Sequence, residues 1–69
     1  MSEATTYHVP EVGSGHCSAA IIEEVGRLKG VQSVEVDLRA KLVLVRGRGV
    51  EATGVVAAIY AAGYEAVIA

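Results

Sequence analysis

Residues 31–47, VQSVEVDLRAKLVLVRG, decide the fold because they hold two strand-like segments separated by a tight turn. In residues 31–38, apolar side chains recur at every second position from Val34, which is the period of a strand with one buried face, and residues 41–47 return the chain with Val43 and Val45 facing inward. The inward-facing set consists of Val34, Val36, Leu38, Val43 and Val45. Arg39 and Ala40 lie between the segments and turn the chain. We therefore expect an antiparallel hairpin.

A helical pattern precedes the hairpin and another follows it. Residues 15–29 predict the first helix, and Gly30 is well placed to end it in a left-handed turn. Its core-facing stripe is Cys17, Ile21, Val25 and Leu28. Residues 50–62 predict the second helix, in which Val55, Ile59 and Ala62 share a face and Gly63 is the stop. Gly54 inside it costs about 1 kcal/mol relative to alanine, so we expect this helix to be the weaker one.

Two further strands complete the order. Residues 5–10 alternate and end at a proline, and residues 64–68 form a short last strand. The order βαββαβ predicts an α+β, ferredoxin-like sandwich, in which a four-stranded antiparallel sheet carries both helices on one face. Residues 1–69 then form a single domain with a loose terminus at residues 1–4. The 11–17 loop, the 38–41 turn and residues 63–64 should be neighbours at one end.

Composition excludes several classes of function. The net charge of −2 argues against nucleic-acid binding, and the absence of Phe and Trp removes the aromatic platform that RNA-binding sheets of this order use. No apolar run approaches the roughly 20 residues of a membrane helix, and residues 1–10 carry no signal core, so we expect a cytoplasmic protein without membrane insertion. No catalytic triad or paired acid site is evident, and Glu23 and Glu24 should lie on a solvated helix face, so we expect no enzyme activity.

Leu42 and Leu44 point to the uncovered face of the predicted sheet. Two exposed leucines there indicate either a contact surface or ordinary exposed apolar residues. All six Lys and Arg fall between Arg27 and Arg48, which either steers a partner or only solvates the loops.

Cys17 is the one cysteine of the chain and lies at the predicted start of the first helix. The amides and positive partial charge of a helix N-terminus stabilise a thiolate, and thiolate sulfur selects Cu(I), Zn(II) and other thiophilic ions. His16 offers an imidazole nitrogen beside it. Alternatively, Cys17 is a small buried apolar residue at the head of the core-facing stripe.

The whole chain resembles the heavy-metal-associated domain of copper chaperones and of the N-terminal modules of metal-transporting P-type ATPases. The resemblance covers residues 6–68 and is carried by GHCSAAI, LKGVQSVEVDL, KLVLVRG and AIYAAGY, in the family's order. The family's metal loop reads Gly-Met-x-Cys-x-x-Cys, and on that pattern Glu11 and Val12 replace the glycine and methionine. Ser14 stands at the first cysteine and Cys17 at the second.

The resemblance implies binding and trafficking of a soft metal, most simply Cu(I), by a degenerate site with one thiolate. Ser14 then serves as a weak ligand or as a helix cap. Tyr64 lies where bacterial chaperones resembling this chain carry a tyrosine beside the metal loop, and it either orients the thiolate or closes that end of the core.

Two functions follow. In the first, Cys17 binds the metal and exchanges it with a metal-transporting P-type ATPase or another thiol carrier. The second ligand then comes from His16, a small thiol, a partner's cysteine, or Cys17 of another copy in a metal-bridged homodimer. In the second, the module no longer handles metal and acts in protein docking or regulation, through Leu42, Leu44 and the basic residues near the hairpin and loops.

Overall fold

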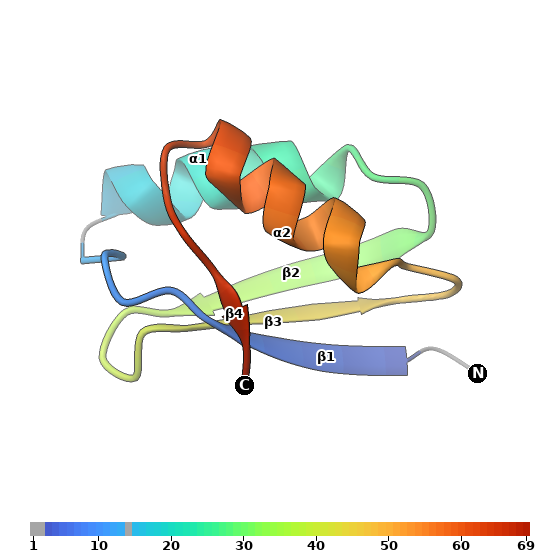
Figure 1. Cartoon of the computed structure of the whole chain (residues 1–69), viewed down its shortest axis with the longest axis horizontal. Coiled ribbons are helices and arrows are strands. Elements are labelled where there is room, and N and C mark those ends of the chain that lie inside the picture. The colour runs from blue at the N-terminus through green and yellow to red at the C-terminus, as the bar shows by residue number, and fades with distance from the viewer. Residues whose placement is uncertain (1–2, 14) are drawn as a thin grey trace.

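The computed structural model describes residues 3–13 and 15–69. Its elements are β1 (Glu3–His8), α1 (Gly15–Gly26), β2 (Val31–Asp37), β3 (Leu42–Gly47), α2 (Ala52–Ala61) and β4 (Val67–Ile68). The strands form one sheet in the order β2-β3-β1-β4, and every pairing is antiparallel. Both helices lie on the same side of this sheet (Figure 1). The predicted ferredoxin-like α+β sandwich is confirmed.

The register of the sheet separates a covered face from an open one. Tyr7 and Val36 flank Val43 across the three longer strands, and the next row places Thr6 and Glu35 beside Leu44. Tyr7 and Val43 are buried beneath the helices, whereas Leu44 belongs to the opposite face. Because side chains alternate along a strand, this register fixes the orientation of every neighbour.

The core lies between the sheet and the two helices. Its buried members are Tyr7, Val9, Val12, Ile21, Val25, Val43, Val45, Val55 and Ile59. The predicted helical stripes supply four of these residues, and Cys17 and Leu28 pack against the core while remaining half-buried. The chain therefore builds a dry aliphatic centre with one tyrosine, as its composition requires.

Several predicted boundaries were wrong. β1 begins at Glu3, because Glu3 and Ala4 pair with the end of β3, so these two residues are not part of a loose terminus. It is assigned only as far as His8, although the amide of Val9 still donates to the carbonyl of Lys41, its in-register neighbour on the other side of the ladder, at 2.8 Å. Residues 1 and 2 lie outside the described part of the chain.

The helices are also shorter than predicted. α1 ends at Gly26 rather than at residue 29, since the amide of Leu28 bonds the carbonyl of Val25 in a tighter turn. Gly30 nevertheless adopts the predicted left-handed conformation, with φ 91°. α2 covers residues 52–61 rather than 50–62. Among the described residues, no helix is long and apolar enough to cross a membrane.

The last strand starts later than predicted, at Val67 instead of residue 64. The amide of Tyr64 donates to the carbonyl of Ile59 at 3.1 Å, so its backbone closes the end of α2 rather than joining the sheet. Gly63, with φ 100°, makes this reversal. Because Tyr64 lies outside the sheet, its side chain can reach Cys17 in α1.

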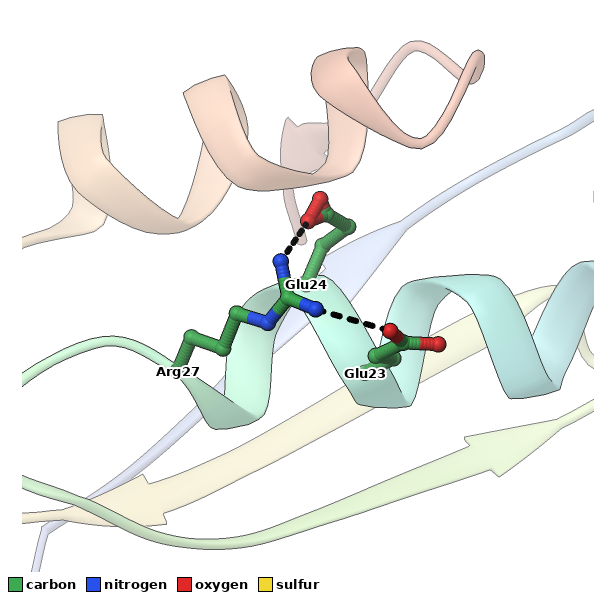
Figure 2. Close-up of polar contacts among 3 residues, drawn as sticks. All are labelled: Glu23, Glu24 and Arg27. Atoms are coloured by element: carbon green, nitrogen blue, oxygen red, sulfur yellow. Dashed lines mark hydrogen bonds and ion pairs between the residues drawn. The ribbon is translucent and has the colours of Figure 1, made fainter.

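The solvent face of α1 behaves as predicted. Arg27 donates to Glu23 at 2.8 Å and to Glu24 at 3.3 Å, as Figure 2 shows. Such exposed pairs contribute at most about 1 kcal/mol, so they solubilise the helix more than they stabilise the fold. The two carboxylates are therefore held by a cation on the outer face and do not converge on a site.

Leu42 and Leu44 lie on the open face, but they are half-buried rather than exposed. A shallow groove runs over them and is bordered by Thr6, Glu35, Asp37 and Arg39, among others. Leu38, predicted to face inward, also borders this groove and is exposed, so that prediction was wrong. Side chains of the neighbouring strands cover part of Leu42 and of Leu44. The expectation of two exposed leucines is corrected to a shallow, partly covered apolar groove.

Candidate metal centre

Three connections meet at one end of the molecule, as predicted. The loop after β1 and the turn between β2 and β3 lie side by side at the left of Figure 1. Lys41 joins them, because its ammonium group donates to the carbonyl of Val12 at 2.7 Å. Tyr64, which follows α2, joins the same end through a hydrogen bond to Cys17. The candidate centre thus combines segments that are far apart in the sequence.

Cys17 lies in the first turn of α1 and is half-buried against the core. Cys17 therefore packs on the core without being fully buried, and its role as a metal ligand stays a prediction. Within the same turn, Ser18 donates its hydroxyl to the carbonyl of Gly15 at 3.0 Å. A helix start is where backbone amides have no helical acceptor, so the sulfur lies in a positive local field.

The phenolic hydroxyl of Tyr64 donates to Cys17 Sγ at 2.8 Å. This contact raises the pKa of Tyr64 above its ordinary value of 10.0, and partial burial and the negative charges of Cys17 and Glu11 add to the effect. The sulfur accepts this hydrogen bond through one of its lone pairs. Tyr64 therefore lies where sequence analysis placed it, beside the candidate ligand.

His16 is exposed at the second position of α1. Consecutive helical residues project about 100° apart and do not face each other. The imidazole and the sulfur therefore leave the helix in different directions. Ser14, the other candidate from the sequence, lies outside the described residues, and its role stays a prediction.

The donor set among the described residues is sparse. Residues 3–13 and 15–69 contain no cluster of three or more His, Cys, Asp and Glu side chains able to hold a metal ion. Hard cations require several oxygen ligands, whereas Cu(I) is selected by soft sulfur. A single sulfur donor therefore suits a soft cation better than a hard one.

Lys41 was missed by sequence reasoning. A lysine in a turn is an ordinary solvent-exposed residue, so its presence does not indicate a contact with the loop. Val12 lies 29 residues away in the chain, so sequence proximity does not indicate the contact either. The predicted meeting of the 11–17 loop with the 38–41 turn was the one available clue. Side-chain geometry was needed to show that an ammonium group bonds the loop.

Comparison with known proteins agrees with this fold. The heavy-metal-associated domain profile matches residues 6–65. Copper chaperone CopZ of Enterococcus hirae is 37% identical over 62 residues, which are 87% of this chain and 90% of that protein. A solved CopZ metallochaperone has a TM-score of 0.89 at 27% identity, covering 94% of this chain and 100% of the other. A copper-binding domain of a P-type ATPase shares the fold, with a TM-score of 0.90 at 22% identity and coverage of 100% and 95%.

The fold and the matching profile place the chain in a class of small ferredoxin-like domains that bind heavy metals. The chain belongs to the heavy-metal-associated domain family and is related to copper chaperones. The relatives named above are metallochaperones and metal-binding domains rather than enzymes.

Proposed function

We propose that this domain binds a soft heavy-metal ion, with Cu(I) as its cargo, and passes that ion to a thiol-bearing partner. The observation that carries the proposal is the position of Cys17, half-buried in the first turn of α1 with the Tyr64 hydroxyl on its sulfur. The relation to copper chaperones supports Cu(I) over Zn(II), which favours four ligands.

Cys17 is the protein's thiolate ligand in this proposal. His16 projects away from it, and the hydroxyl of Ser14 is a poor donor to Cu(I). The second strong ligand therefore comes from a small thiol, from a partner's cysteine, or from Cys17 of a second copy. The site is degenerate relative to a loop with two cysteines, and it holds its ion less tightly alone.

Transfer proceeds by ligand exchange. A thiolate of the partner binds the ion while the Cys17 sulfur is still attached, and the Cys17 sulfur then leaves. No redox change occurs, and the incoming thiol gives up its proton to solvent as its sulfur binds. Tyr64 keeps the Cys17 sulfur oriented toward the surface by donating to one lone pair.

The partner that suits this chemistry is a metal-transporting P-type ATPase or another thiol carrier. A copper-binding domain of a P-type ATPase shares the fold, so the two modules can present their ligands from equivalent loops. We further propose a cytoplasmic, non-catalytic role, in keeping with a thiol that must stay reduced.

Competition between the protein and a copper chelator tests the proposal. Cu(I) is titrated into a mixture of the protein and a weak competing chelator, and the chelator's absorbance reports how much metal the protein retains. We expect retention by the wild type and by His16→Ala, and loss in Cys17→Ala. Equal retention by wild type and Cys17→Ala would overturn the proposal.

Protein docking through the open face is the competing function. The groove over Leu42 and Leu44 favours it to a limited extent, because these leucines are half-buried and offer little apolar area. Metal retention that depends on Cys17 separates the two functions. If the wild type leaves Cu(I) with the chelator, the docking function is the one that remains.

A further inference from the structure

We propose that Lys41 is a positioning residue of the metal site. Its ammonium group fastens the loop that leads from β1 into α1, and this holds Cys17 where it can retain an ion. The inference rests on the proposed function and adds to it a residue from a different segment of the chain.

Lys41 contacts the loop at two points. Its carbonyl accepts the amide of Val9 at 2.8 Å, and its ammonium group donates to the carbonyl of Val12 at 2.7 Å. The amide of Val12 in turn donates to the carbonyl of Val9 at 3.1 Å. These three hydrogen bonds close a ring that runs from the end of β1 through the loop to the turn after β2.

The hydrogen bond from the Lys41 ammonium group holds the carbonyl of Val12, from which the chain continues toward Cys17. A Cβ at Gly13 would lie 3.6 Å from Lys41 Nζ, so the cation sits beside the residue that follows Val12. The side chain of Val12 is fully buried, which leaves its carbonyl in a part-buried setting. A charge-assisted bond there is stronger than a neutral one, and a lost partner would leave the carbonyl unsatisfied.

The backbone of Lys41 adopts an unfavourable conformation in the turn between β2 and β3. Its φ is 61°, in the left-handed region that disfavours side chains other than those of Gly, Asn and Asp. Asp37 supports the turn by accepting the amides of Arg39 and Ala40, both at 3.0 Å. A lysine at such a position is poorly suited to the turn alone, and its bond to Val12 gives it a reason to be there.

Two simpler explanations must be separated from this one. Lys41 could stabilise the fold as a whole, or it could act only as a positive charge at this end of the molecule. If Lys41 anchors the loop, substituting it changes hydrogen exchange only in residues 12–17. That change depends on whether the new side chain has a donor that reaches the Val12 carbonyl.

Four variants distinguish these explanations. Lys41→Asn keeps a residue that tolerates positive φ but removes the donor, and Lys41→Arg restores one. Arg39→Asn removes a positive charge from the same turn, where Arg39 takes part through its backbone amide. Val55→Ala lowers stability from the buried core of α2, away from the site.

Amide hydrogen exchange is measured on the metal-free proteins, and Cu(I) release to a chelator is timed on the loaded ones, below every melting temperature. We expect Lys41→Asn to speed exchange of the Val12 amide and release of Cu(I) by roughly tenfold or more, the scale of a lost charged hydrogen bond. Lys41→Arg should restore both rates most of the way. Arg39→Asn and Val55→Ala should leave the exchange rate of the Val12 amide and the release rate of Cu(I) close to those of wild type, although Val55→Ala speeds exchange of the core amides.

The outcomes distinguish this inference from the function on which it rests. If wild type retains Cu(I) and Lys41→Asn retains it as long, or if Val55→Ala produces the same local change, the inference about Lys41 fails while the proposed function stands. If wild type yields its Cu(I) to a weak chelator at once, both fail.

Discussion

Tyr64 and Cys17 meet although they lie 47 residues apart in the chain. The contact depends on the reversal at Gly63, which turns the chain back after α2 and leaves the tyrosine facing the start of α1. A phenol that donates to sulfur holds its proton more tightly, and this gives the site a measurable signature in the absence of metal.

We expect Cys17→Ala to lower the pKa of Tyr64 toward 10.0, because the principal cause of its elevation, the hydrogen bond to Cys17, is removed. The measurement is an NMR titration of the Tyr64 ring through the alkaline range. Cys17→Ser keeps an acceptor and should lower the pKa less. An identical Tyr64 pKa in wild type and Cys17→Ala would contradict the assigned contact.

The same shift makes stability depend on pH. The pKa of Tyr64 is raised in the folded state, so its contribution is fully present below about 10, the ordinary pKa, and is lost as the pH rises through the folded-state pKa. Burial raises the pKa of Tyr7 as well. Because Tyr7 is present in wild type and in Cys17→Ala, it affects the pH dependence of stability equally in the two proteins. Denaturant titrations should therefore show a steeper alkaline loss of stability in wild type than in Cys17→Ala.

For single residues, the sequence predicted which side chains lie near the candidate site better than it predicted the hydrogen bonds and burial of those side chains. Tyr64 and Cys17 were placed together by resemblance and by topology. The half-burial of Leu42 and Leu44 was not predicted, because cover from neighbouring strands depends on side-chain conformations. Lys41 was not predicted either, since a lysine in a polar turn has no distinguishing pattern until its neighbours in space are known.

Among the elements, α2 combines a buried apolar face with a glycine in its interior. Gly54 has no φ in the left-handed region, and the nearest atom to an added Cβ is Leu28 Cδ1 at 4.0 Å. An alanine therefore fits without displacement. The glycine costs helix stability without a visible steric reason for its presence.

We expect Gly54→Ala to stabilise the protein by about 0.5–1 kcal/mol, because alanine loses less backbone entropy in a helix. For a domain of this size, that raises the melting temperature by roughly 2–8 °C. Calorimetry or thermal circular dichroism measures the shift. A lower melting temperature would show that the space beside Leu28 is not available.

Gly47→Ala is the opposite case. An added Cβ would lie 2.1 Å from the carbonyl oxygen of Gly30, which is backbone and cannot move aside easily. Gly47 ends β3 at the point where it lies close to Gly30, in the connection between α1 and β2. The backbone amide of Arg48 donates to the same Gly30 carbonyl at 2.9 Å. We expect a large loss of stability in the same calorimetric measurement, and a neutral result would contradict the close approach.

The order and type of all six elements followed from apolar periodicity. The ends were less predictable, because helix termini and strand ends are decided by single hydrogen bonds. α1 stops at Gly26 and β4 starts at Val67 for that reason, although the hydrophobic pattern continues beyond both limits. The deciding bonds are those of the Leu28 amide with the Val25 carbonyl and of the Tyr64 amide with the Ile59 carbonyl.

For the whole molecule, a domain of 69 residues has a small core and one candidate thiolate. The proposed single-thiolate site leaves a bound Cu(I) short of soft ligands, so a second molecule is a natural source of the missing sulfur. Because both copies would contribute Cys17, the joined form is a symmetric pair bridged by the metal.

Cu(I) should therefore cause dimerisation when no other thiol is present, with one ion for two chains. Native mass spectrometry or analytical ultracentrifugation would report the mass. Excess small thiol should return the protein to monomers by supplying the second ligand, and Cys17→Ala should stay monomeric throughout. Dimers that persist in Cys17→Ala, or that form without metal, would contradict bridging through this sulfur.

The most direct test of the central claim is X-ray absorption at the copper edge of the Cu(I)-loaded protein. We predict sulfur scattering in the first shell of wild type, prepared without added thiol, and loss of both bound copper and that scattering in Cys17→Ala. A first shell of nitrogen and oxygen alone in wild type, or sulfur scattering that survives in Cys17→Ala, would contradict the assignment of Cys17 as the ligand.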